Sequence, residues 1–119
     1  MLELLSNARA ALNISDMQVE HWNPEIDGPL SEDALRQKLS GHGYDVTRYV
    51  YPPGTHFSDH THEIDKLDAV LSGRFRMTLG GQSVVLQAGD CLFVPRGAVH
   101  SAEVLGEEPV VSLDATRSG

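Results

Sequence analysis

From Tyr44 onward, apolar and polar residues alternate in short runs that Gly, Pro or Asp separate. An alternation with a period of two is typical of strands that bury one face, and residues 74–79 (RFRMTL) show it clearly. The pattern predicts eight strands, near residues 44–51, 56–62, 67–72, 74–79, 83–87, 91–95, 98–105 and 109–114. Many short strands at regular spacing predict an all-β fold, either an antiparallel sandwich or a barrel.

The first 43 residues have a different pattern. Leucine and alanine recur at roughly helical spacing over residues 2–12, which predicts a short amphipathic helix or an ordered arm. Residues 17–22 alternate weakly and predict a short strand. Ser31 precedes two acidic residues and begins a predicted short helix that Gly41 ends. We therefore expect one folded domain, with an arm and a short helix at 1–43 and the barrel at 44–119.

Composition limits the classes of function. The chain has 119 residues, one ordinary domain, and a formal net charge of −8 with scattered basic residues, so nucleic acid is not an expected partner. The single Cys91 cannot form an internal disulfide, and its apolar surroundings predict a buried thiol, which fits a cytoplasmic protein. No apolar stretch is long enough for a membrane span, and residues 1–10 lack the features of a secretion signal.

Three histidines supply the candidate chemistry. His60 and His62 are two residues apart in a predicted strand, so both side chains are expected on one face, where they would form half of a metal site. His100, after a distant strand, is the expected third member. Imidazole suits transition metals, and three protein ligands leave coordination positions open for water, oxygen or substrate. The opposing interpretation is a set of hydrogen-bonded strand histidines that bind no metal.

The spacing of these residues resembles the two motifs of the cupin family. The first motif is matched by Gly54, His60-Thr61-His62 and Gly73, and the second by Gly89, Pro95-Arg96-Gly97 and His100. The resemblance implies a small jelly-roll β-barrel with a divalent transition metal (Fe, Zn, Mn or Ni) held at the barrel mouth by His60, His62 and His100. It does not imply one reaction, because cupins include isomerases, oxygenases, lyases, cyclases, sugar-binding proteins and storage proteins.

Lys66 departs from the family pattern, which places a metal-binding Glu four residues after the second histidine. An ammonium about 5 Å from a dication would be repelled by about 6 kcal/mol at an effective dielectric constant of about 20. Lys66 therefore turns away, stays neutral through a depressed pKa, is offset by a nearby acid, or marks a pocket without metal. Asp68 shares its strand parity and is the expected partner. A buried structural ion pair and a functional lysine both stay open at this point.

Alternation also suggests the walls of a pocket for a small organic ligand, formed by Tyr49, Tyr51, Phe57, Phe75, Met77 and Phe93. In an enzyme, Lys66, Asp68 or a tyrosine such as Tyr51 would move a proton beside the metal. His56 shares the parity of His60 and could enlarge the histidine cluster, but we interpret it as a cap of the loop after Gly54.

Three classes of function stay open. The first is a metal-dependent oxygenase, isomerase or lyase acting on a small metabolite. The second is a non-catalytic sensor or small-molecule-binding cupin with a degenerate metal site, and the third is a structural protein. The resemblance further implies a homodimer that covers an edge strand.

Overall fold

The computed structural model describes residues 17–117, so the helix predicted for residues 2–12 lies outside the described residues. The described part of the chain contains nine strands and two helices. Their bounds are β1 (Gln18–Glu20), α2 (Pro24–Asp27), α3 (Glu32–Ser40), β2 (Asp45–Tyr51), β3 (His56–His60), β4 (Asp65–Ser72), β5 (Arg74–Leu79), β6 (Gln82–Leu86), β7 (Cys91–Val94), β8 (His100–Leu105) and β9 (Val110–Arg117). Within residues 17–117, neither helix is long and apolar enough to cross a membrane.

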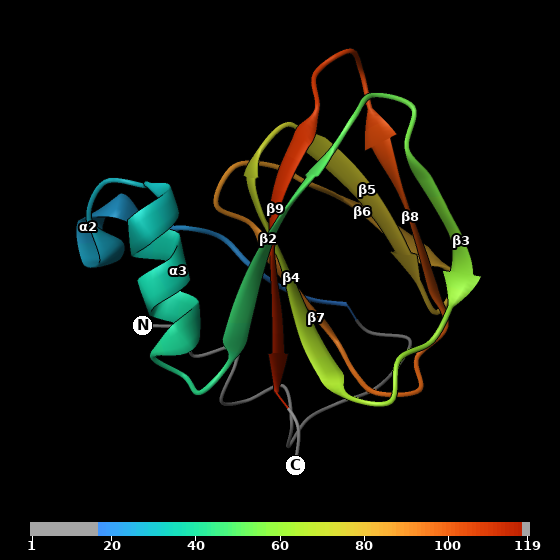
Figure 1. Cartoon of the computed structure of the whole chain (residues 1–119), viewed down its shortest axis with the longest axis horizontal. Coiled ribbons are helices and arrows are strands. Elements are labelled where there is room, and N and C mark those ends of the chain that lie inside the picture. Colours follow the sequence, from blue (N-terminus) through green and yellow to red (C-terminus); the bar gives the residue numbers. More distant parts are fainter. Residues whose placement is uncertain (1–16, 118–119) are drawn as a thin grey trace.

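The strands form two antiparallel sheets that face each other (Figure 1). One sheet has five strands in the order β1-β7-β4-β9-β2, and the other has four in the order β3-β8-β5-β6. Strands that are adjacent in a sheet mostly come from distant parts of the chain, as in a jelly roll. The predicted all-β jelly-roll barrel with short helices before it is confirmed.

Two hydrophobic clusters lie on opposite faces of the five-stranded sheet. One fills the space between the sheets and includes Val70, Phe75 and Met77. The other lies between the outer face and α3, whose Leu35 and Leu39 are fully buried. Because β7 is buried on both faces, its sequence does not reveal which residues point inward.

The outer cluster contains two residues of β7 that the sequence analysis singled out. Cys91 is buried there, as predicted. Phe93 is also in this outer cluster rather than among the cavity-lining residues, so its predicted place in the pocket wall is wrong.

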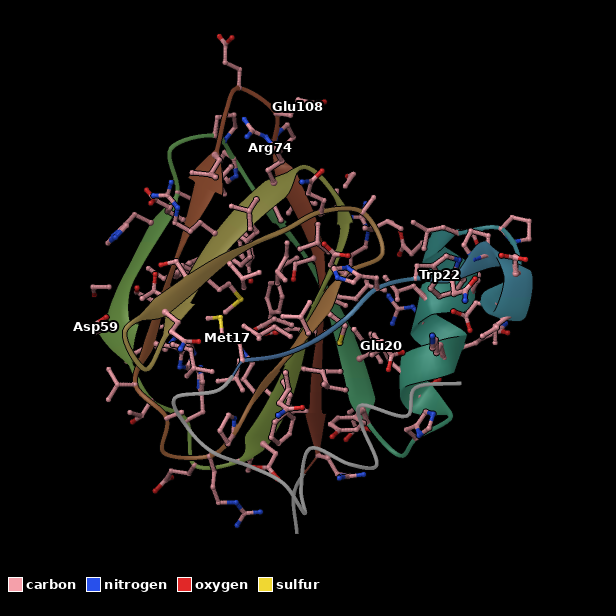
Figure 2. The ribbon with its side chains drawn as sticks, turned by 180° about the vertical axis from the view of Figure 1, so that it is seen from behind. Met17, Glu20, Trp22, Asp59, Arg74 and Glu108 are labelled. Carbon is pink, nitrogen blue, oxygen red and sulfur yellow. The ribbon has the colours of Figure 1, made fainter. Side chains whose placement is uncertain are left out.

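The segment before the barrel is packed against it. In α3, Ser31 Oγ accepts a hydrogen bond from the Ala34 N–H at 3.0 Å, and Gly41 is the C-cap, as predicted. The weak strand pattern becomes β1, which pairs with β7. Between Met17, which packs on the inner cluster, and Trp22, which packs on the outer one, the chain crosses the back of the barrel (Figure 2). The division of the chain at residue 43 stays a prediction.

The sequence did not indicate α2. This single helical turn begins at Pro24, and the Asn23 side chain caps it by accepting a hydrogen bond from the Glu25 N–H at 3.0 Å. Proline is favoured in the first turn of a helix because it has no N–H to leave unpaired there. The Asn-Pro pair was therefore a usable signal.

All eight predicted strands are present as β2 to β9, with two differences that matter for the site. The second predicted strand, β3, ends at His60 instead of residue 62. β9 extends to Arg117 instead of residue 114, because it is paired on both sides, with β4 and with β2.

Candidate metal centre

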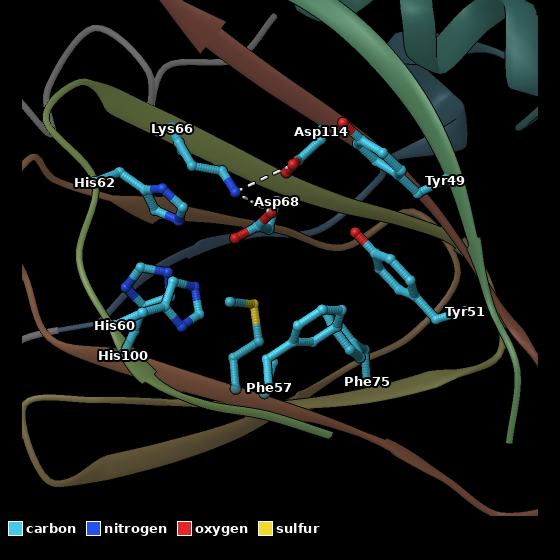
Figure 3. A pocket seen from close by; sticks show the side chains of 12 residues that line it. Tyr49, Tyr51, Phe57, His60, His62, Lys66, Asp68, Phe75, His100 and Asp114 are labelled. Carbon is cyan, nitrogen blue, oxygen red and sulfur yellow. Dashed lines mark ion pairs between the residues drawn. The ribbon is translucent and has the colours of Figure 1, made fainter. Parts of the chain in front are cut away.

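A cavity of about 320 Å³ lies between the two sheets. Figure 3 shows three groups of side chains around it. The histidines gather at one end, and a lysine with two aspartates lies along β4 and β9. Aromatic rings from β2, β3 and β5 form the remaining wall. The lining residues are Tyr49, Tyr51, Phe57, His60, His62, Lys66, Asp68, Phe75, Met77, His100, Ala102 and Asp114.

His60, His62 and His100 converge as the sequence predicted. One ring nitrogen from each lies within 4.8 Å of the others. The ring centroids are 4.9 Å apart for His60 and His62, 4.2 Å for His60 and His100, and 5.0 Å for His62 and His100. His60 on β3 pairs directly with His100 on β8, so sheet register brings two of the three rings together.

Backbone carbonyls orient two of these rings. His60 Nδ1 lies 2.7 Å from the Ser58 carbonyl oxygen, and His100 Nδ1 lies 3.0 Å from that of Ala98. A carbonyl oxygen only accepts, so each Nδ1 carries the proton and donates, which leaves the Nε2 lone pair free. A metal-binding histidine commonly has this arrangement, with its second nitrogen held by a carbonyl or a carboxylate.

His62 provides the most direct indication of a metal. Its Nε2 atom is buried and has no hydrogen-bond partner among the described residues. A buried polar atom without a partner is unfavourable unless something outside the chain binds it. The three residues therefore fit a metal ion, since their donor set is three imidazoles with two lone pairs already directed.

The electrostatic surroundings favour neutral imidazoles. Burial lowers the pKa of His62, and the nearby Lys66, His100 and His60 lower it further. Burial also lowers the pKa of His100, against the raising effect of the Ala98 carbonyl, and the nearby His60 and Lys66 lower it further. Neutral imidazole is the form that binds a metal.

His62 joins the triad from a loop instead of from the regular strand that the sequence predicted. A register shift between Phe57 and His60 interrupts β3, and His62 lies in the loop beyond it. A β-bulge of this kind changes which residues face inward. As a result Phe57 and His60, three residues apart, both line the cavity, whereas His56 is exposed and outside the triad. The expectation that His56 faces the same way as His60 and could enlarge the cluster is therefore wrong, and His56 is the first residue of β3.

Lys66 forms a buried ion-pair network across β4 and β9. Its Nζ lies 3.1 Å from Asp114 Oδ2 and 3.6 Å from Asp68 Oδ1, and Figure 3 shows both pairs. Burial disfavours the ammonium, but the attraction of Asp68 and Asp114 outweighs it and raises the pKa of Lys66. Of the four alternatives for this residue, the side chain neither turns away nor has a depressed pKa. An acid offsets its charge, and the predicted pair with Asp68 is present.

Asp114 and Ala102 line the cavity but were not predicted from the sequence, and Asp114 is the charged one. Asp114 lies in β9, within the largely apolar run VVSLDA at residues 110–115, and it faces Asp68 directly in the β4–β9 register. A lone acidic residue inside an apolar strand was the available signal. Its Oδ1 atom is buried and has no hydrogen-bond partner within residues 17–117.

Two further groups of the cavity lining have raised pKa values. Burial raises the pKa of Asp68 well above its ordinary value, and the neighbouring Asp114 raises it further, against the opposing effect of Lys66. Burial, followed by the charges of Asp114 and Asp68, also raises the pKa of the Tyr51 phenol. Tyr51, Asp68 and Lys66 all line the cavity with the triad, and their catalytic roles stay predictions.

An antiparallel jelly roll with a histidine triad in its cavity defines a small β-barrel protein with a candidate transition-metal site. The family model for the cupin domain matches residues 47–116. The chain belongs to the cupin family.

The chain is similar to parts of several named proteins. A nitrosourea synthase of Streptomyces achromogenes subsp. streptozoticus is 33% identical over 69 residues, which cover 57% of this chain and 15% of that protein. A crystal structure of the DMSP lyase DddQ from Ruegeria pomeroyi is 25% identical with a TM-score of 0.54, covering 61% of this chain and 38% of that chain. An RmlC-like cupin from Shewanella frigidimarina is 25% identical with a TM-score of 0.56, covering 61% and 64% respectively. The chain thus spans only a small part of the synthase.

Proposed function

We propose that this cupin is a metal-dependent enzyme that acts on a small organic molecule bound in the cavity. The observation that carries the proposal is the buried His62 Nε2 without a partner, beside two histidines whose Nδ1 atoms donate to backbone carbonyls. Three protein ligands are typical of a catalytic metal centre, whereas structural centres usually have four.

Residues of the chain would bind the metal and move a proton. His60, His62 and His100 would hold Fe, Zn, Mn or Ni, and the ion would supply a Lewis acid that polarises an oxygen of the substrate. Burial raises the pKa values of Asp68 and Tyr51, which favours the protonated form of each, so each is a candidate proton donor at the cavity wall. Lys66 would hold the two aspartates in place through its ion pairs.

The relatives support an enzyme without selecting one reaction. The chain resembles part of a protein named nitrosourea synthase and the fold of a protein named DMSP lyase. Both names are those of enzymes, and their reactions differ, so the reaction class of this chain stays open among oxygenase, isomerase and lyase. The small-molecule partner, the homodimer and the cytoplasmic location expected from the sequence are likewise proposals.

One observation favours a second candidate, a non-catalytic cupin that binds or senses a small molecule. Lys66 occupies the position where the family motif supplies a carboxylate ligand, and it is held inside the cavity as a cation. A binding module needs the cavity but does not need a working metal centre.

Metal analysis of protein prepared without a histidine tag separates the two candidates. We expect stoichiometric transition metal in the wild type and its loss in His62→Ala. His56→Ala is the matched control, because His56 lies on β3 but is exposed and outside the triad. A wild type that binds no metal, and gains one only as Lys66→Glu, would overturn the metalloenzyme proposal in favour of the binding module.

A further inference from the structure

We propose that the ligand of this cavity is an organic anion, with a carboxylate or similar oxyanion at the histidine end and an uncharged aromatic or other apolar body along the wall of Tyr51, Phe57 and Phe75. This inference rests on the proposed function, because it places the oxyanion beside the metal that the triad would hold. It adds the substrate class, which neither the fold nor the relatives specify.

The first argument is the charge of the cavity lining. The triad consists of three neutral donors and includes no carboxylate, so a bound dication would keep its full charge. The acidic residues of the lining, Asp68 and Asp114, are both paired with Lys66. A divalent ion and one ammonium against two carboxylates leave the lining net positive, and more so when Asp68 is protonated. An anionic ligand would balance this charge.

The second argument concerns hydrogen bonding. An ammonium has three N–H donors, and Lys66 Nζ has two ion-pair partners among the described residues, Asp114 Oδ2 at 3.1 Å and Asp68 Oδ1 at the longer distance of 3.6 Å. The third donor is available to a ligand in the cavity that Lys66 lines. An oxyanion is the strongest acceptor for such a donor, because both partners of the hydrogen bond are charged.

The third argument is the opposite wall, which is apolar over a large continuous area. Tyr51 stacks on Phe75 with centroids 5.5 Å apart, and Phe57 meets Tyr51 edge-to-face at 5.0 Å. Met77 and Ala102 continue this surface. A polyol or sugar would leave its hydroxyl groups without hydrogen-bond partners at this wall. A ring or a hydrocarbon chain has no polar groups there that need a partner.

The same features disfavour a cationic ligand. Aromatic rings attract cations, but the two acidic residues of the lining both lie within ion-pair distance of Lys66, which offsets part of their charge even though Asp114 Oδ1 has no hydrogen-bond partner among the described residues. The rings of Tyr51, Phe57 and Phe75 also contact one another. A cation would in addition be repelled by the metal and by Lys66.

Three ligands of similar shape and different charge test the inference: hydrocinnamate, its neutral amide and phenylpropylammonium. Each is titrated calorimetrically into the full chain loaded with cobalt(II), and the visible absorption of the cobalt is recorded. We expect hydrocinnamate to bind roughly tenfold or more tightly than the other two, and to change the cobalt spectrum. Acetate should change the spectrum as well, but should bind more weakly because it lacks the apolar body.

Two variants locate the contacts. Lys66→Met should weaken hydrocinnamate and leave the amide unchanged, and Arg76→Met is its control because Arg76 pairs with Glu103 on the exposed face of β5. Phe57→Leu should weaken hydrocinnamate but not acetate. The ligand series on the wild type needs neither variant to fold.

The outcomes separate this inference from the function on which it rests. If cobalt binds at the triad but the amide or the ammonium compound binds as tightly as hydrocinnamate, only the anion inference is overturned. Equal affinity for acetate and hydrocinnamate would overturn the apolar body in the same way. A chain that takes up no cobalt would overturn both the inference and the proposed metal centre.

Discussion

Asp68 on β4 lies directly opposite Asp114 on β9, and the Lys66 ammonium lies within 3.6 Å of one and 3.1 Å of the other. Two carboxylates in facing positions of a sheet repel each other, and burial increases that repulsion. Lys66 compensates by pairing with both. A lysine at the position of a family carboxylate is thus accommodated by two acids on neighbouring strands.

Removing the lysine should destabilise the protein strongly. Lys66→Met leaves two buried carboxylates without their cation, and loss of one partner of a buried pair costs about 3–5 kcal/mol. Urea denaturation measures the change in the free energy of unfolding. Arg76→Met breaks an exposed pair with Glu103 and should cost no more than about 1 kcal/mol. Equal losses in the two variants would contradict a structural role for the Lys66 network.

Asp68 should make stability fall as the pH rises. Its folded-state pKa is raised above the unfolded value of about 3.9, so the native state binds the proton more tightly than the unfolded chain does. The resulting stabilisation is complete below about pH 4 and is lost as the pH rises through the folded pKa. Asp68→Asn does not titrate and keeps the shape of the protonated acid.

The free energy of unfolding of Asp68→Asn, relative to wild type, should therefore increase between about pH 4 and pH 7, as urea denaturation at both pH values would measure. Asp59→Asn, at an exposed position of β3, is the control and should show little change between the two pH values. A difference that shrinks with rising pH would show that Asp68 is ionised in the folded protein.

Gly73 should tolerate alanine poorly. It joins β4 to β5 with φ of 86°, and an added Cβ would lie 2.4 Å from the Pro109 carbonyl oxygen. Gly54 has nearly the same φ, 85°, but nothing within 4 Å of its added Cβ. Both substitutions force alanine into the left-handed region, which costs on the order of 1–3 kcal/mol. Thermal denaturation should show a clearly larger loss for Gly73→Ala, and equal losses would mean that the turn relaxes freely.

The homodimer expected from the sequence stays a proposal, and the structure provides a strand with which to test it. β2 is at the edge of the five-stranded sheet, and Tyr49 and Val50 are 44% and 50% exposed. Such an edge tends to pair with another strand, and a second copy would cover both edges at once by two-fold symmetry. Light scattering should show a dimer for the wild type and a monomer for Val50→Lys.

The matched control for the dimer is Val99→Lys, since Val99 is 55% exposed but lies outside β2. It should leave the dimer intact. A wild type that is monomeric at all concentrations would contradict the proposed dimer. A monomeric Val99→Lys would indicate that the interface includes Val99 instead of β2 alone.

The sequence by itself determined the fold and the three histidines. Period-two alternation and turn residues are local features, so β2 to β9 could be predicted without knowing which strands pair. The motif spacing then correctly predicted that His60, His62 and His100 lie together. The predicted regular strand over residues 56–62 was partly wrong, because β3 contains a bulge and His62 lies in the loop after it.

Only the tertiary structure decided the surroundings of the triad. Asp114 reaches Lys66 through the pairing of β4 with β9, which joins residues 46 positions apart in the sequence, as the facing pair Asp68 and Asp114 shows. Phe93 lies on the outer face of β7. The sequence could not show this, because β7 is covered on both sides and its apolar run has no solvent-exposed face that would mark its orientation. Alternation shows which residues share a face of a strand, but strand pairing decides what that face meets.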